Sequence, residues 1–420
     1  MILLVALLMT SGLLYLLMDD RTEAVFEHTF DSSVHGYFYY GNVALDDDAV
    51  YVGTSVKWHA LRDEGGIPSN FLLIALDKRD GGPLWSQDLG RGEVISGPML
   101  ADGKVLVSVR AFDEDGYRVN VSVMAFAVAD GSLVWIREVV STIPVDPTRE
   151  GPEEQQWLST FHQAGLAWDG QHLLAGGDNI HLLDIEDGNV IWAAAPSSPD
   201  ENVNHMIIQG GFAYASTRSG VDRVLLTDGG VSRFSPIGIS TPWQMTGCQD
   251  GGIILGTSGS LVRLNSTGDV VWEYSTGGQD VRAQAAIDAD GNIYVGTKAN
   301  QQSYFFKLSA DGEEAWRVDV GADMYSSPSL GDDGRVYVGS ENWNGRGGTV
   351  HILNSSDGNA DGRIIVGRDI MWMSPAIDGG LLYVGGMGGS FAAYEVEAVG
   401  LLASHWPTRD RNLNRTASIT

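Results

Sequence analysis

The sequence predicts an all-β fold, an eight-bladed β-propeller whose blades are four-stranded antiparallel sheets. A β-rich run that ends in small residues occurs eight times along the chain. A glycine followed four residues later by a tryptophan occurs five times, in the same phase as these runs. Successive copies lie roughly forty to fifty-five residues apart, the range in which propeller blades repeat. Two independent motifs that share one phase indicate an array of similar sheets.

The β-rich runs are expected to be buried strands bounded by tight turns. The clearest copy has strands at Leu261–Leu264, around Trp272, around Ala285–Ile287 and at Asn292–Gly296. Gly, Asn and Asp lie between these strands because they accept the positive φ of tight hairpins. The eight runs are Ala49–Thr54, Lys104–Arg110, Gln171–Gly176, Phe212–Ser216, Gly252–Gly256, Asn292–Gly296, Arg335–Gly339 and Leu381–Gly385.

The five repeated tryptophans are interpreted as structural docking residues rather than as a ligand cage. A lone four-stranded sheet exposes both faces and is only marginally stable, whereas radial stacking buries both faces. A flat ring at a fixed point of each outer strand can wedge between blades while its indole N–H donates to a backbone carbonyl. These residues are Trp85, Trp135, Trp192, Trp272 and Trp316. Phe234 stands in a substituted copy of the motif, and Asp357–Ile365 is a degenerate copy.

The spacing around these tryptophans carries a family resemblance. The pattern Ala75-x-Asp77-x₃-Gly81-x₃-Trp85, which recurs from Leu182 to Trp192, resembles the docking repeat of pyrroloquinoline-quinone-type β-propellers. The segment from Trp406 to Thr416 is similar to one that often flanks such propellers. The architecture is also similar to that of the propeller subunit of the bacterial outer-membrane barrel-assembly machinery. The acylated cysteine of that lipoprotein has no counterpart, since Cys248 is the only cysteine.

The resemblance implies that the tryptophan strand is the outermost strand of each blade, which leaves the last blade incomplete. This blade, at about 372–394, has no outer strand of its own. Residues 24–30, with Phe26 near the tryptophan position, are expected to supply it and to join the two ends of the ring. The predicted divisions are a hydrophobic segment at 1–20, the propeller at 24–394 and a C-terminal tail at 395–420.

Charge and composition exclude some functions. The formal net charge of −28 rules out the basic surface that nucleic acid requires. The simplest interpretation of this negative charge is an acidic, soluble surface. Adaptation to salt and calcium dependence are the alternative interpretations. The single Cys248 excludes an intrachain disulfide and is expected to be a small core residue.

The N-terminal segment bears on location. The apolar run Ile2–Met18 contains no charged residue and is at the short limit for crossing a bilayer. An uncleaved membrane anchor, a cleaved signal segment and a buried helix are the alternatives. The expected location is extracytoplasmic, either membrane-anchored through this segment or secreted.

Candidate binding residues lie in the loops that lead into the innermost strands. These loops should line one mouth of the axial channel, and aromatic and hydrogen-bonding groups that converge on a concave face can bind a ligand or partner. The alternative is that they fill the channel as ordinary packing. The residues are His162, Gln163, His205, Trp243, Gln244, Arg282, Tyr325 and Trp372.

A second candidate site is a calcium loop. Asp357, Asn359 and Asp361 match the opening D-x-N-x-D-G of an oxygen-rich calcium loop. The glutamate expected at the twelfth position is absent, because Arg368 stands there. A turn between two strands explains the same residues without a metal.

The predicted function is an exported, non-catalytic, monomeric propeller that binds or scaffolds proteins of the cell envelope. The resemblance to quinone-dependent dehydrogenases implies a planar cofactor in the axial cavity, commonly with Ca²⁺ and often with an adjacent cysteine pair. The chain has no such pair, and pyrroloquinoline quinone is therefore not expected as a cofactor. The alternatives are a quinone-dependent oxidoreductase that uses the axial cavity, or a polysaccharide-binding module.

Overall fold

The structure is a computed structural model that describes most of the chain. The described residues are 23–36, 38, 43–55, 69–114, 118–140, 165–198, 203, 205–236, 239, 243–299, 302–341, 348–366, 373–386 and 389–419. The hydrophobic segment predicted at 1–20 lies outside them. Within the described ranges, no helix has the length and apolar character needed to cross a membrane.

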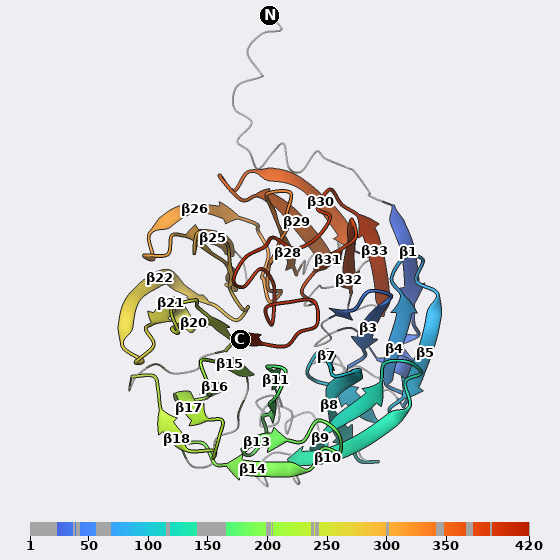
Figure 1. The fold of residues 1–420 in the computed structure, drawn as a ribbon. Coiled ribbons are helices and arrows are strands. Elements are labelled where there is room, and N and C mark those ends of the chain that lie inside the picture. Colours follow the sequence, from blue (N-terminus) through green and yellow to red (C-terminus); the bar gives the residue numbers. More distant parts are fainter. Residues whose placement is uncertain are drawn as a thin grey trace, which may run out of the picture.

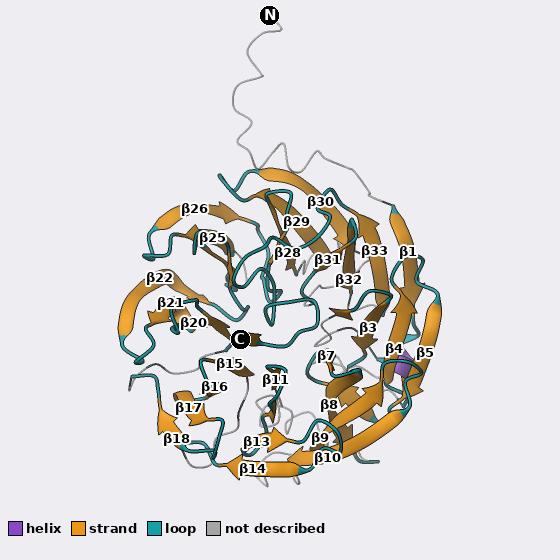
Figure 2. Cartoon of the chain, viewed as in Figure 1, coloured by secondary structure: helices purple, strands orange, loops and turns teal. Residues whose placement is uncertain are grey.

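Eight antiparallel sheets are arranged radially around a common axis, which confirms the eight-bladed β-propeller (Figure 1). The only helix of the described residues is the single turn α2 (Ser32–His35) beside the first blade (Figure 2). In each blade the strand that precedes the β-rich run lies on the axial side, as predicted. In blade 4 a C-terminal strand, β34 (Ser418–Ile419), pairs in parallel with β15 (His205–Gln209) on that side and lies nearer the axis.

The first four blades follow one another along the chain. Blade 1 contains β2 (Ala44–Leu45), β3 (Ala49–Gly53), β4 (Leu72–Asp77) and β5 (Pro83–Asp88). Blade 2 contains β6 (Gly92–Val94), β7 (Met99–Ala101), β8 (Lys104–Phe112), β9 (Arg118–Ala127) and β10 (Leu133–Val140). Blade 3 contains β11 (Leu166–Trp168), β12 (Leu173–Ala175), β13 (Ile180–Leu183) and β14 (Val190–Ala194). Blade 4 contains β15 (His205–Gln209), β16 (Phe212–Thr217), β17 (Gly220–Leu225), β18 (Val231–Arg233) and, from the C-terminus, β34 (Ser418–Ile419).

The other four blades complete the ring. Blade 5 contains β19 (Met245–Gly247), β20 (Ile253–Gly256), β21 (Ser258–Leu264) and β22 (Val270–Asp280). Blade 6 contains β23 (Ala286–Ile287), β24 (Ile293–Gly296), β25 (Tyr304–Leu308) and β26 (Glu314–Asp319). Blade 7 contains β27 (Ser329–Leu330), β28 (Arg335–Ser340), β29 (Gly348–Asn354) and β30 (Ala360–Val366). Blade 8 contains β31 (Ala376–Asp378), β32 (Leu381–Gly385), β33 (Ser390–Glu395) and β1 (Ala24–Thr29).

The ring is closed by β1, which pairs antiparallel with β33. Phe26 on β1 lies against the next blade, because a Cβ built on Gly81 would meet its ring at 2.5 Å. His28 adds a contact of 2.5 Å between its Nε2 and the carbonyl oxygen of Gly81. Strands from the two ends of the propeller therefore form one sheet, so the last blade depends on the start of the chain.

The repeated tryptophans join five of the blades to the blade that follows. The Nε1 of Trp85 donates to the carbonyl of Val128 at 2.9 Å, and its ring leaves no space for a Cβ on Gly131. The other four indoles make the same kind of bond to the blade that follows. Their acceptors are the carbonyls of Ile185 for Trp135, Leu226 for Trp192, Ala310 for Trp272 and Ser355 for Trp316.

A β-bulge recurs beside each of these tryptophans. In blade 1, Trp85 pairs with Ala75 while Pro83 pairs with Leu76, so Leu84 is the extra residue. The register shifts at the same point in the other four blades that carry a docking tryptophan. A bulge re-aims the side chains around it. Here it turns the residue before the tryptophan outward, which explains why Leu84 is 53% exposed and Ile191 is 60% exposed.

Candidate functional site

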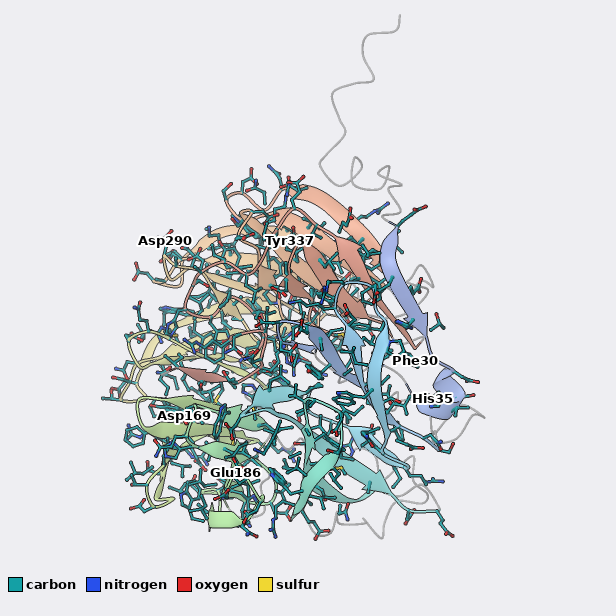
Figure 3. The ribbon with its side chains drawn as sticks, turned by 45° about the vertical axis from the view of Figure 1, so that its right-hand side comes forward. Phe30, His35, Asp169, Glu186, Asp290 and Tyr337 are labelled. Atoms are coloured by element: carbon teal, nitrogen blue, oxygen red, sulfur yellow. The ribbon has the colours of Figure 1, made fainter. Side chains whose placement is uncertain are left out.

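The axial channel opens on two unlike faces. One, here named the hairpin face, carries the turns between first and second strands and between third and fourth strands. The other, named the crossover face, carries the connections from one blade to the next. The labelled Asp169, Glu186 and Asp290 belong to turns of the hairpin face, and His35 lies in the crossover from β1 to β2 (Figure 3).

The C-terminal tail covers the channel at the hairpin face and ends near the centre of the ring (Figure 1). Its carbonyls accept hydrogen bonds from the innermost strands of six blades, at 2.8–3.0 Å. The donors are the backbone N–H groups of Leu45, Leu100, Trp168, Ile208, Ile287 and Leu330. In blade 8, the N–H of Gly380 donates to the carbonyl of Val399. Blade 5 is contacted by packing, because Gly247 lies against the fully buried Trp406.

Backbone strain is concentrated in this tail. Four of the five non-glycine residues with positive φ in the described ranges lie there: Asp410, Arg411, Arg415 and Ala417. For a residue with a Cβ, this conformation costs about 1–2 kcal/mol. Such strain persists only where the surrounding structure determines it, and it clusters at functional sites. In this tail it directs the side chains of Asp410 and Arg415 into the channel.

A cavity lies between the tail and the crossover face. It is lined by the tail residues Arg409, Asp410 and Arg415 and by groups from blades 2 to 5, including His205 and Gln244. The centre of a water molecule can occupy about 40 Å³ of this cavity. One water needs roughly 10–15 Å³ on that measure, so the cavity holds a few waters or a small polar group.

Charged groups of the tail dominate this cavity. Asp410 accepts a hydrogen bond from His205, with 3.2 Å between Oδ1 and Nε2. Burial acts to raise the pKa of Asp410, but the His205 bond and the charges of Arg409 and Arg415 outweigh it and lower that pKa. Arg415 is only 2% exposed, and burial lowers its pKa to about 10. Two guanidinium groups therefore face a single carboxylate among the described lining residues.

Buried hydrogen bonds fix the tail against the blades. The Nε of Arg415 donates to the carbonyl of Val43 at 2.7 Å, and its Nη1 donates to the carbonyl of Arg409 at 2.6 Å. The amide oxygen of Gln284 accepts from the N–H of Asp410 at 2.7 Å. These bonds join blades 1 and 6 to the tail and hold the charged side chains in fixed positions.

An aromatic cluster lies beside the cavity, in the crossover loops of blades 5 to 7. The guanidinium carbon of Arg282 lies 4.6 Å from the ring centroid of Trp243 and 5.7 Å from that of Tyr325. Asp280 accepts a hydrogen bond from this guanidinium, with 2.9 Å between Oδ2 and Nη2. All three residues of the cluster are half-buried, so part of each remains open to a partner. A cation over aromatic faces contributes about 0.5–2 kcal/mol, depending on desolvation.

The structure groups the predicted mouth residues into two sets. His205 and Gln244 line the cavity, while Trp243, Arg282 and Tyr325 form the aromatic cluster. His162, Gln163 and Trp372 lie outside the described residues. The sequence prediction did not include Arg409, Asp410 and Arg415, although they lie within the segment that resembles the flanking region of such propellers.

The predicted calcium residues take part in a turn and an ion pair. Asp357 accepts hydrogen bonds from the backbone and side chain of Asn359, at 3.0 and 2.8 Å. Asp361 pairs with Arg335 at 3.2 Å. In the described ranges, no group of three or more His, Cys, Asp or Glu side chains is arranged to hold a metal ion. Calcium binding at Asp357, Asn359 and Asp361 stays a prediction.

Comparison with known proteins places this propeller in a family. The family model described as outer membrane protein assembly factor BamB matches residues 39–221, 119–297 and 257–395. The chain belongs to this family. The crystal structure of BamB from Moraxella catarrhalis has a TM-score of 0.60 and 14% sequence identity, over 90% of this chain and 98% of that one. At this identity the likeness to a solved BamB shows the shared fold.

Two other proteins are similar to this chain, one in fold and one in sequence. The computationally designed Ika8 protein has a TM-score of 0.61 and 13% identity, over 86% of this chain and 98% of that one. The quinoprotein alcohol dehydrogenase PedH of Pseudomonas putida is 25% identical over 238 residues, 54% of this chain and 35% of that enzyme. The match therefore spans about a third of the dehydrogenase. A propeller fold supports many functions, so activity has to be argued from the site.

Proposed function

We propose that this BamB-family protein is a non-catalytic scaffold of the cell envelope that binds a partner protein at the crossover-face mouth of its channel. The family supports an envelope location and a role in protein interaction. The observation that carries the proposal is the half-buried cluster of Trp243, Arg282 and Tyr325. The tail covers the opposite end of the channel, so the proposal assigns the partner to the crossover face.

The chemistry of the cluster fits a protein interface. Tryptophan, tyrosine and arginine are the residues enriched at binding hot spots. Three crossover loops from consecutive blades hold them, and Asp280 fixes the Arg282 guanidinium against the rings. A pre-formed cluster loses little side-chain entropy on binding, which favours affinity. The indole N–H of Trp243 is buried and has no hydrogen-bond partner among the described residues, so the exposed part of its ring is the part that a partner can contact.

The test is capture of a partner from envelope extracts by wild-type protein and by Trp243→Ala and Arg282→Ala. A hot-spot residue contributes at least about 2 kcal/mol, which is roughly a thirtyfold loss of affinity. Arg317→Ala is a matched control, because Arg317 on the outer strand β26 of blade 6 makes the same kind of contact with Tyr304 on β25. A partner retained by both mouth variants, or lost equally with Arg317→Ala, contradicts the proposal.

A quinone-dependent oxidoreductase is the second candidate, because the chain resembles PedH over 238 residues. The size of the cavity weighs against this candidate. The centre of a water molecule can occupy only about 40 Å³ of it, which is too little for the three fused rings of pyrroloquinoline quinone. No catalytic step is derived from this site. Adding pyrroloquinoline quinone and Ca²⁺ to purified protein decides between the candidates. Stoichiometric retention of the chromophore with dye reduction by alcohols or sugars would replace the scaffold proposal, and its absence leaves the scaffold.

A further inference from the structure

The floor of the channel contains two guanidinium groups whose donors are not all used. Arg415 is 2% exposed, and its Nη2 has no hydrogen-bond partner among the described residues. The Nε of Arg409 is also buried without a hydrogen bond, although it lies 3.6 Å from Asp410 Oδ2. Both residues line the same cavity. Unused donors on buried cations mark a position for an acceptor.

The charges of this cavity do not balance within the described lining. Asp410 is its only carboxylate, and this carboxylate already accepts a hydrogen bond from His205. A buried charge without a partner is strongly destabilising, because the interior does not replace its hydration. The lowered pKa values of Arg409 and Arg415 reflect the same burial. One additional negative charge would compensate the excess.

We propose that the cavity at the base of the channel binds a carboxylate group, held by the free guanidinium donors of Arg409 and Arg415. Guanidinium groups pair with carboxylates through short, charge-assisted hydrogen bonds. One excess positive charge matches a singly charged carboxylate better than a doubly charged phosphate. The available space also suits a group of about three or four heavy atoms, the size of acetate. This site goes beyond the proposed scaffold function and does not depend on it.

The first test measures thermal unfolding of the full chain in increasing sodium acetate, with sodium chloride at equal ionic strength as the reference. A ligand that binds only the folded state raises Tm in a saturable way. We expect this rise for acetate and no such rise for acetamide, which has the same shape without the charge. If Tm changes with sodium acetate in the same way as with sodium chloride, the proposal is overturned.

Two variants distinguish acetate binding at this site from a general effect of salt on stability. Arg409→Gln removes one free guanidinium but keeps the carbonyl that Arg415 uses. It should weaken the acetate response about tenfold or more, as expected for a lost charge-assisted bond. Arg411→Gln is the control, because Arg411 is its tail neighbour with positive φ and does not line the cavity. Equal responses in the two variants overturn the proposal.

A gain-of-charge variant tests the site from the other direction. The amide oxygen of Gln244 is buried in the cavity lining without a partner among the described residues. Gln244→Glu supplies a permanent carboxylate of the same shape. It should raise Tm in the absence of acetate and remove most of the acetate response. A lowered Tm together with an unchanged response contradicts the site.

The carboxylate can be that of a free metabolite or that of an acidic side chain on a bound protein. The blocked tripeptide Gly-Asp-Gly, with Gly-Asn-Gly as its neutral control, distinguishes these sources from each other. Binding of acetate alone identifies a small free carboxylate, and preference for the aspartate peptide identifies a side chain. Trp243→Ala should leave both responses intact, so failure of this site and failure of the partner interface are distinguishable.

Discussion

The rim and the axis of this propeller are built in different ways. At the rim the same junction recurs, with an indole that donates to the next blade and a glycine that makes space for its ring. At the axis a single tail, with one buried Trp406 and two arginines, contacts the innermost strands of different blades. The difference teaches that the rim distributes stability over many similar contacts. The axis concentrates charge, strain and unused donors in a single segment.

Removing the closing strand should have the largest effect. A chain that begins at Asp31 lacks β1, so β33 loses its pairing and Phe26 no longer packs on Gly81. An open ring exposes the faces and edges of its end blades. We expect Tm to fall by many degrees. The control chain begins at Glu23 and keeps β1. Equal Tm values for the two chains would refute closure of the ring by this strand.

Truncating the axial tryptophan is expected to rank second. Trp406 is fully buried between the tail and the inner strands. Trp406→Ala should lower the free energy of unfolding by about 3–5 kcal/mol, as for large core aromatics. Chemical denaturation measures this loss. A change below about 1 kcal/mol, typical of surface substitutions, would show that the tail packs only loosely on the ring.

A pair of glycine substitutions isolates one rim junction. Gly131 and Gly103 both have a φ of +70°, but only Gly131 would place a Cβ against Trp85, at 2.5 Å. Gly103→Ala should cost about 1–2 kcal/mol from backbone conformation alone. Gly131→Ala should cost about 1–3 kcal/mol more from overpacking. If denaturant titrations show equal losses of unfolding free energy for the two variants, the contact between Gly131 and Trp85 does not contribute to stability.

The last expected effect is a pH dependence within a blade, and it is confined to a narrow range of pH. Burial lowers the pKa of His351 on β29 to about 4. Between pH 6.5 and 4 the unfolded chain takes up a proton that the folded protein does not, so stability falls as pH falls. The slope from this group is at most about 1.4 kcal/mol per pH unit. His351→Gln should flatten the profile in that window, and an unchanged profile would contradict the assignment.

The rim could be predicted from the sequence because its physics repeats. Each docking tryptophan lies four residues after a glycine, and the turn residues recur in phase with the buried strands. The same repeat phase selected Trp243, Arg282 and Tyr325 as candidate binding residues, because each lies a few residues before an innermost strand. Their distances to one another depend on the blade geometry and required the structure.

The axis could not be predicted in the same way. The tail has no period, and its main-chain bonds join residues as far apart as Leu45 and Leu413. Whether Arg415 is a surface or a buried residue depends on where the tail runs, which local sequence does not state. The available signal was the resemblance of the segment from Trp406 to Thr416 to a flanking region of related propellers.

Amide hydrogen exchange tests the central claim, that one tail organises the axis, most directly. The N–H groups of the innermost strands donate to the tail in six blades: Leu45, Leu100, Trp168, Ile208, Ile287 and Leu330. We predict that all six amides are protected from exchange in the full chain. In Trp406→Ala they should exchange faster together while amides of the rim strands stay protected. Fast exchange of these six amides in the wild-type protein would contradict the account.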